Sequence, residues 1–301
     1  MSKKPKVGMW SGLTAVTAVL TAGAIVGTTV AFHYTTTVNN YLDADTYKII
    51  KGDSDEDTEY FKSDFTSDEE RESYEAELCQ QVEAEGAALL KNENNALPLA
   101  SGAKVSLFGH GSVDLMYGGT GSGSVDTSKA PNFKQALEDQ GIQVNSTLWD
   151  LYSSDDMMKN YSRITPAAIS DTLEANTQYA VNEAPWSKLS SAESSFPDYG
   201  DAAIVVFSRS GGEGADLPSG ENGTNDSWIK GQEGDGNYLA LSAEEKELLH
   251  NLKTLKDNGT FKKIIVLINS SNAIEMDFLN PEICGEDYGI DSAMWIGDVG
   301  Q

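Results

Sequence analysis

Carboxyl-bearing side chains gather in one long polar loop, which holds the residues with the clearest chemical potential in this sequence. The loop runs from Arg209 to Leu239 and follows the apolar run AAIVVFS at 202–208. Its acidic residues and one tryptophan are Glu213, Asp216, Glu221, Asp226, Glu233, Asp235 and Trp228. Glu213 stands between glycines just after the apolar run, where partial desolvation would raise its pKa toward the range of a general acid. We expect most of the other carboxylates to be solvated, because Asp and Glu are seldom buried.

Glycoside hydrolysis is one reaction that uses such residues, and it needs two carboxyl groups flanking the scissile bond. One group protonates the leaving oxygen, and the other acts as a nucleophile or a base. Trp228 could stack on a sugar ring or simply cover the loop, and the sequence leaves both readings open. The loop therefore offers an acid candidate, but nothing in it identifies the partner carboxylate.

A glycine-rich loop, GHGSVDLMYGGTGSGS at 109–124, is the second unusual segment. It has the first two glycines of a dinucleotide fingerprint, but Asp114 stands at the third position and no clear helix begins there. Its later half lacks the Lys-Ser/Thr of a phosphate loop. Nucleotide binding is therefore a minor alternative, and a connection without any ligand is another.

Apolar runs alternate with helix-forming segments across the rest of the chain. We predict strong strands at 104–109, 202–208 and 263–270, and weaker ones at 142–145 and 292–297. Such runs, separated by helices, predict an α/β fold with a mainly parallel sheet sandwiched by helices. Both unusual loops begin at a strand carboxyl end, where ligands of these sheets bind. We expect the functional site at that shared edge.

Helix boundaries are suggested by capping signals. Ser67 with Glu70 forms a capping-box pattern that predicts a helix to about Asn92, and Ser242 with Glu245 predicts another to about Asp257. A third helix is expected at 133–140. In the first helix, the apolar residues expected to share one loosely spaced buried face are Tyr74, Leu78, Val82 and Leu89.

The first segment is apolar enough to cross a membrane. No charged residue occurs from Val7 to Phe32, and a spanning helix needs about 20 apolar residues. The lysines that precede it, Lys3, Lys4 and Lys6, predict a cytoplasmic N-terminus with everything after residue 34 outside the cell. We favour an uncleaved anchor in the cell membrane over a cleaved signal peptide, because the run continues to Tyr34 without a small-x-small site. Residues 35–66 are predicted to be an acidic spacer.

Composition excludes several partners and cofactors. Acidic residues outnumber basic ones 47 to 21 in the 301 residues, a net charge of −26 that repels phosphate backbones and argues against nucleic acid. The two cysteines, Cys79 and Cys284, are too far apart in sequence for a zinc or redox motif. The three histidines are scattered as well. We therefore predict no metal site and no cofactor.

An ordered series of segments resembles the second domain of glycoside hydrolase family 3. The pieces are EGAALLKNENNALPL (85–99), VSLFGHGSVDLMYGGTGSGSV (105–125), IVVFSRSGGEGADLP (204–218), GDGNYLALSAEEKELL (234–249), KKIIVLINSSNAIEMDFL (262–279) and the closing AMWIGDVGQ. Each piece alone is weak evidence, but the order of the series is specific. The resemblance covers residues 75–301.

The resemblance implies a retaining two-step mechanism, in which a (β/α)8 barrel supplies an aspartate nucleophile and this domain supplies the acid/base. That role falls on Glu213, with Glu221 and Glu233 as less favoured candidates. Leu217 stands where many relatives have Arg, which puts that contact in question. The residues expected to line the sugar pocket are Gly119, Thr120, Gly121, Ser122, Asp216 and Trp228.

The resemblance also implies the domain organisation. We expect a basic tip and membrane anchor at 1–34, the spacer at 35–66 and the sandwich domain at 67–301, incomplete at its end. A barrel of about 250 residues has no room before it, so the barrel is expected downstream and the fragment alone is expected to be inactive. The leading hypothesis is a surface-anchored β-glucosidase-like enzyme acting on an oligosaccharide or glycoside. The alternative is a non-catalytic, membrane-tethered carbohydrate-binding module.

Overall fold

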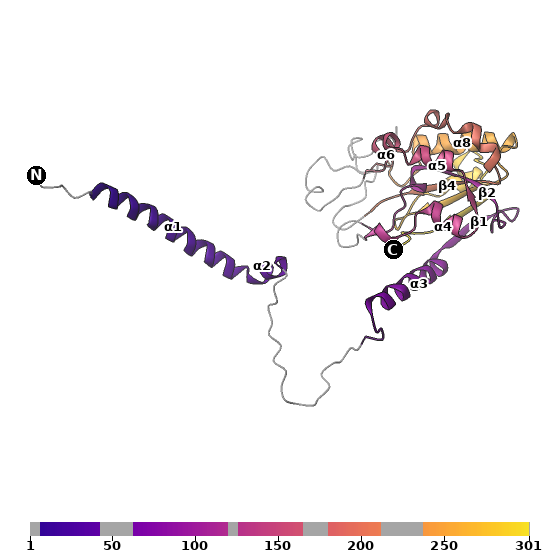
Figure 1. Ribbon diagram of the computed structural model, residues 1–301. Coiled ribbons are helices and arrows are strands. Elements are labelled where there is room, and N and C mark those ends of the chain that lie inside the picture. Colours follow the sequence, from indigo (N-terminus) through magenta and orange to yellow (C-terminus); the bar gives the residue numbers. More distant parts are fainter. Residues whose placement is uncertain (1–6, 43–62, 120–125, 165–179, 212–236, 301) are drawn as a thin grey trace, which may run out of the picture. The chain divides into compact units, whose positions relative to one another are not determined.

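The computed structural model describes residues 7–42, 63–119, 126–164, 180–211 and 237–300 (Figure 1). The chain divides into two compact units, Met1–Asp64 and Phe65–Gln301. The first unit contains two helices, α1 (Val7–His33) and α2 (Thr35–Tyr41). The second unit contains the sheet and the remaining helices.

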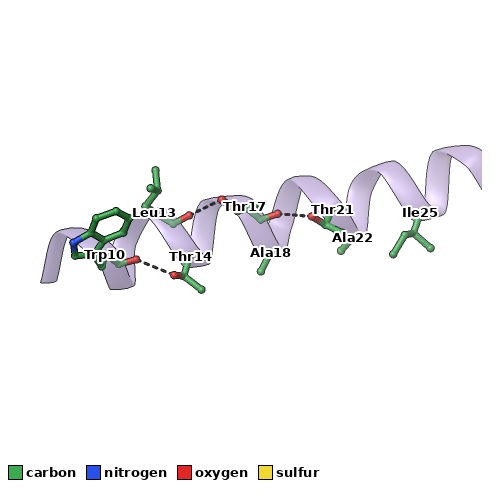
Figure 2. A pocket seen from close by; sticks show the side chains of 8 residues that line it. All are labelled: Trp10, Leu13, Thr14, Thr17, Ala18, Thr21, Ala22 and Ile25. Atoms are coloured by element: carbon green, nitrogen blue, oxygen red, sulfur yellow. Dashed lines mark hydrogen bonds between the residues drawn. The ribbon is translucent and has the colours of Figure 1, made fainter. Parts of the chain in front are cut away.

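Helix α1 is long and apolar enough, by length and composition, to cross a membrane between Trp10 and His33. A signal sequence would pass the same test. Figure 2 shows that threonine hydroxyls along α1 donate hydrogen bonds to backbone carbonyls one turn earlier, as Thr14 does to Trp10 and Thr17 does to Leu13, both at 2.9 Å. Their polar hydrogens are thus satisfied within the helix, which suits an apolar surrounding. Helix α2 occupies the start of the segment that we predicted to be a spacer.

The second unit is built on a six-stranded mixed sheet. Its strands are β1 (Ala88–Asn92), β2 (Lys104–Phe108), β3 (Gln143–Val144), β4 (Ala202–Ser208), β5 (Ile264–Asn269) and β6 (Ser292–Trp295). They lie in the order β1-β6-β5-β4-β2-β3. Neighbouring strands are parallel except for β1, which pairs antiparallel with β6. The fold is therefore α/β, with helices flanking the sheet as expected.

Helices and 3₁₀ turns fill the connections between the strands. The helices are α3 (Asp68–Gly86), α4 (Phe133–Asp139), α5 (Ser146–Tyr152), α6 (Asp155–Tyr161), α8 (Ala243–Asp257) and α9 (Pro281–Cys284). The 3₁₀ turns are η1 (His110–Ser112), η3 (Thr127–Lys129), η4 (Trp186–Leu189), η5 (Glu193–Tyr199) and η8 (Asp277–Leu279). In Figure 1, α5, α6 and α8 lie on one side of the sheet and α4 on the other.

Strand β4 shows why the central apolar runs are continuous. Ala203, Val205 and Phe207 belong to one buried cluster, which includes residues of α5 and α8. Ala202 and Ile204 face the opposite cluster, against which α4 packs. Because successive side chains point to opposite faces and both faces are covered, every position of β4 is apolar until Ser208.

The predicted helix from Ser67 to Asn92 is wrong at its C-terminal end. Helix α3 ends at Gly86, and 88–92 form β1 instead. Ala88, Leu89 and Leu90 have good helix propensity, but pairing with the edge of β6 satisfies their backbone groups and overrides that preference.

The predicted buried face of this segment is also wrong. Tyr74, Leu78 and Val82 are 52%, 43% and 62% exposed on α3, and Leu89 is 52% exposed on β1. No residue of α3 is buried. Helical spacing shows which apolar residues lie on the same side of a helix, but it does not show whether another element packs against that side.

The order of the strands creates a switch point between β2 and β4. From β2 the chain moves outward to the edge strand β3, and it then returns to β4 on the other side of β2. The connections that leave β2 and β4 therefore diverge from adjacent carboxyl ends, aligned with Phe108 opposite Val205. Ligands of α/β domains commonly bind at such a switch point. The two loops singled out in the sequence begin at these adjacent strand ends.

Candidate active site

Two glycines allow the chain to turn tightly after β2. Gly109 has φ +83°, and a Cβ there would lie 2.7 Å from the Val206 carbonyl oxygen. At Gly111 a Cβ would lie 2.8 Å from the same oxygen and against Ser208 Oγ. The turn thus passes directly over β4, at a distance that only glycine permits. This contact brings the starts of the two loops together.

A buried carboxyl group, Glu183, supports this turn from below. It accepts hydrogen bonds from the backbone N–H of His110 at 2.7 Å and of Ala184 at 3.0 Å. The neighbouring Tyr152 hydroxyl accepts from the Gly109 N–H at 3.2 Å. Burial raises the pKa of Glu183 to about 8, and the nearby charge of Glu245 adds to the effect. Glu183 is therefore mostly protonated at neutral pH.

Asp114 and Arg163 form an ion pair at the far end of the turn. Their side chains approach to 3.1 Å, and Asp114 also lies 3.2 Å from Nε2 of the buried His110. Burial works to raise the pKa of Asp114, but the hydrogen bond with His110 and the charge of Arg163 outweigh it and lower the pKa. Arg163 further donates to the carbonyls of Asp114 and Leu115. The chain is thereby fixed as it enters the second half of the glycine-rich loop.

Asn269, at the end of β5, connects Met116 to the C-terminal segment. Its side-chain oxygen accepts from the Met116 N–H at 2.5 Å, and its amide donates to the carbonyls of Met116 at 3.0 Å and Gly297 at 2.7 Å. Asn269 is fully buried. Backbone bonds from Val299 to Met116 and from Gly300 to Tyr117 continue the alignment at 3.1 and 2.9 Å.

The polar loop after β4 begins at a buried arginine. Arg209 is fully buried and forms a two-pronged ion pair with Glu245 of α8, with both N–O distances at 2.8 Å. The guanidinium also donates to the carbonyls of Ser208, Tyr238 and Ala240 at 3.0, 2.7 and 2.7 Å. Burial alone would lower the pKa of Arg209, but Glu245 more than offsets it, so the arginine stays charged.

Tyr238 adds a second connection between the two ends of this loop. Its hydroxyl accepts from the Ser210 N–H at 2.9 Å and lies 3.2 Å from the Ser210 carbonyl, to which it donates. Gly211 then packs against Asn272, where a Cβ would lie 2.8 Å from Oδ1. Residues 209–211 and 238–240 therefore form one buried base for the loop.

Most of the predicted site residues lie outside the described residues, and their roles stay predictions. They are the acid candidates Glu213, Glu221 and Glu233, and the pocket residues Thr120, Gly121, Ser122, Asp216 and Trp228. Gly119 is described and is half-buried, just beyond the segment held by Asn269. The described part of the chain does bring together the bases of both loops. Among these described residues, no group of His, Cys, Asp or Glu could hold a metal ion.

The residues that build those bases were not predicted from the sequence. Arg209 is the first residue of the predicted polar loop, and a charge directly after a buried strand is a signal for a buried ion pair. Its partner Glu245 was recognised only as a capping residue, a role it also performs. No local sequence pattern indicates the roles of Glu183 and Asn269, because their hydrogen-bond partners His110 and Met116 lie 73 and 153 residues away in sequence.

Comparison with protein families identifies the domain. Residues 87–295 match the model of the glycosyl hydrolase family 3 C-terminal domain. The chain belongs to glycosyl hydrolase family 3. The resemblance inferred from the ordered motifs is thereby confirmed, and the glycine-rich turn and the Arg209 base belong to a family 3 C-terminal domain.

Two curated relatives of this family 3 chain are β-glucosidases. It is 30% identical over 216 residues to β-glucosidase A of Butyrivibrio fibrisolvens, covering 66% of this chain and 23% of the relative. It is 29% identical over 230 residues to a β-glucosidase of Ruminococcus albus, covering 74% of this chain and 20% of the relative. The chain thus spans less than a quarter of the length of these two relatives.

Solved structures share the fold of the family 3 domain. A β-glucosidase from Paenibacillus barengoltzii superposes with a TM-score of 0.53 at 26% identity, covering 74% of this chain and 21% of that enzyme. β-Glucosidase 3B from Thermotoga neapolitana, solved with glucose, has a TM-score of 0.53 at 24% identity, covering 77% of this chain and 28% of that one. At that identity the second similarity concerns the fold alone.

Proposed function

We propose that this domain is part of a retaining β-glycosidase, β-glucosidase-like in its substrate class, and supplies the acid/base loop and one side of the sugar pocket. The observation that supports the proposal is that the described starts of both loops, residues 109–119 and 209–211, leave the adjacent carboxyl ends of β2 and β4. One loop would contact the sugar through Gly119–Ser122, and the other would deliver Glu213, Asp216 and Trp228. The β-glucosidase relatives support this substrate class.

Glu213 is the proposed acid/base because it follows the fixed end of its loop most closely. Only Gly212 separates it from the buried Gly211. Glu221 and Glu233 are the less favoured candidates, because they lie farther from either end. A carboxyl group placed over a water-poor crevice would keep a raised pKa and could protonate the leaving oxygen.

The nucleophile of the proposed reaction would come from a second domain. Retaining hydrolysis requires two carboxyl groups about 5 Å apart, one of which forms a covalent glycosyl intermediate. By family resemblance, the second carboxyl group is an aspartate of a (β/α)8 barrel that closes over the carboxyl edge of this sheet. We propose that such a domain completes the active protein.

A leaving-group comparison tests the role of Glu213. In the complete enzyme, Glu213→Gln should lower kcat on substrates with poor leaving groups by about 100- to 10,000-fold, because protonation of the leaving oxygen is lost. Activated nitrophenyl glycosides, which need little protonation, should lose much less. Glu221→Gln and Glu233→Gln serve as controls. An equal loss on both substrate types would exclude Glu213 as the acid.

Sequencing the gene beyond codon 301, together with a panel of nitrophenyl glycosides, tests the function itself. A barrel domain downstream and hydrolysis of a β-glucoside would support the enzyme. A stop codon after Gln301, with sugar binding but no hydrolysis, would instead favour the non-catalytic carbohydrate-binding module.

We also propose that residues 7–32 anchor the protein in the cell membrane with the sheet domain outside.

A further inference from the structure

We infer that Glu183 is a proton-dependent latch for the turn His110–Ser112, which stays closed while the Glu183 carboxyl group is neutral and is released when that group ionises. The turn is the start of the connection that leaves β2. The inference concerns this turn and its buried contacts, so it does not depend on the proposed function.

Glu183 holds the turn through one short hydrogen bond in a buried position. One of its oxygens accepts from the His110 N–H at 2.7 Å, and the other accepts from the Ala184 N–H at 3.0 Å. Glu183 is 5% exposed and His110 is 3% exposed. His110 begins η1, and Ser112 closes the turn by donating from Oγ to the Gly109 carbonyl at 2.7 Å. Glu183 therefore joins the turn to the chain segment that precedes η4.

The one buried arginine beside this group among the described residues has no N–H left for it. Arg209 lies close enough to Glu183 for their charges to interact. A guanidinium has five N–H groups. All of them already donate, two to Glu245 and three to backbone carbonyls. An ionised Glu183 would therefore be a second buried carboxylate near Glu245, without an ion pair of its own among the described groups.

Other ionisable groups face Glu183 or its segment from the elements packed around it. They are His110 and Asp114 after β2, Tyr152 of α5, and Glu244, Glu245 and Glu247 of α8. The imidazole of His110 is paired with Asp114 at 3.2 Å through Nε2. Burial raises the pKa of Tyr152, so its hydroxyl stays neutral. The groups from α8 are all carboxyl groups, so ionisation of Glu183 would add a negative charge beside others.

The difference in pKa between the closed and the open turn gives the direction of the latch. Burial raises the pKa of Glu183 to about 8, although the hydrogen bond from His110 opposes this, whereas a solvated glutamate ionises near 4.5. Below 4.5 the group is neutral in both forms, and the closed turn has its full stability. Between the two values only the open form has lost its proton to solvent, so each pH unit favours opening by up to about tenfold. The turn is therefore released as pH rises toward 8.

The released segment is short, because the chain is fixed again soon after the turn. Before it, β2 pairs with β4 as far as Phe108. After it, Asp114 forms its ion pair with Arg163 at 3.1 Å. Release therefore involves residues 109–113, which pack against β4, and leaves the sheet intact.

Amide exchange of single histidines can measure the latch. The chain contains three histidines, His33, His110 and His250. The full chain is labelled with ¹⁵N-histidine in detergent micelles, and the backbone amide signals are assigned by nuclear magnetic resonance with His33→Asn and His250→Asn. Solvent exchange of each amide is followed from pH 5 to pH 9 and corrected for the rate of an unstructured histidine amide. His250 lies in α8 of the same unit and serves as the reference.

We expect protection of the His110 amide to fall at least about tenfold between pH 6 and pH 8, with protection of the His250 amide unchanged. Glu183→Gln keeps the size of the side chain but cannot ionise, so this pH dependence should disappear. The matched control is Glu247→Gln, because Glu247 also accepts a backbone N–H, that of Trp186 at 3.0 Å, from an exposed position. This control should leave the fall at His110 in place.

Constant protection of His110 in the parent chain would overturn the inference, and this outcome requires no variant at position 183 to fold. A parallel fall at His250 would overturn it as well, because it would indicate unfolding of the whole unit. Loss of the pH dependence in Glu247→Gln would count against Glu183 in the same way. Sugar hydrolysis enters none of these measurements, so a failure of the proposed function would be seen separately.

Discussion

At the scale of single residues, Glu183 has the most unusual chemistry of the described part. Its pKa rises from 4.5 to about 8 on burial. Between these values the folded protein holds a proton that the unfolded chain has released, so the folded state loses stability as pH rises from 4.5 to 8. Below 4.5 both states are protonated and the contribution is fully present.

Glu183→Gln should remove this dependence, because glutamine fits the same space without titrating. Between pH 5 and pH 8 the free energy of unfolding of the parent should fall relative to the variant by up to about 4 kcal/mol. Urea unfolding followed by tryptophan fluorescence at three pH values measures the difference. Parallel pH profiles for the two proteins would contradict a raised pKa at Glu183.

Asn269 shows how one side-chain amide can hold two backbone segments together. Asn269→Leu keeps the volume but leaves the Met116 N–H and the Gly297 carbonyl without their partner. We expect a loss of about 2–4 kcal/mol in unfolding free energy, since several buried polar groups lose a hydrogen bond. The control is Asn251→Ala on α8, whose side chain donates to the Glu247 carbonyl one turn away. Equal effects of the two substitutions would remove the special role of Asn269.

At the scale of elements, the site depends on a turn passing within contact distance of a strand. Gly111→Ala places a Cβ 2.8 Å from the Val206 carbonyl oxygen, so the turn must move away from β4. We expect destabilisation by about 1–3 kcal/mol, as for other overpacked sites. Gly86→Ala, at the end of α3, meets no atom of the described residues within 4 Å and should be neutral or stabilise by up to about 1 kcal/mol. Thermal unfolding of both variants measures the contrast, and a neutral Gly111→Ala would refute the close approach.

Helix α8 serves the site through its first turn. Glu245 accepts the Ser242 N–H at 2.8 Å as part of the capping box, and it also pairs with Arg209. One side chain therefore begins the helix and holds the base of the polar loop. Because helix and loop share this residue, the start of α8 cannot shift without moving the exit of the loop.

At the scale of the whole molecule, the proposed anchor makes a topological prediction. The three lysines before α1 should keep the N-terminus in the cytoplasm, so protease added to intact cells should degrade the unit 65–301. Fractionation should recover the full-length chain from membranes rather than from the medium. N-terminal sequencing supplies the control, because a cleaved signal peptide would give a shortened chain in the medium. Protection of the sheet domain in intact cells would reverse the proposed orientation.

The sequence by itself determined the elements whose signals are local. The apolar run at 202–208 gave β4, because a strand covered on both faces must be apolar at every position. The capping box at Ser242 gave the start of α8, since the bonds involved join residues three apart. The ordered motifs identified the family. The predicted ends of the strands β2 and β4 indicated the edge of the sheet where the two loops begin.

Only the tertiary structure decided which elements meet. Residues 88–92 became a strand because the edge of β6 was available, and the apolar side of α3 stayed exposed because no described element covers it. The pairing of Arg209 with Glu245 and of Asn269 with Met116 joins residues 36 and 153 positions apart. Such contacts depend on the path of the whole chain, which no local pattern of residue types can encode. The sequence shows which residue types the two loops carry, whereas the buried base from which they start is seen only in the structure.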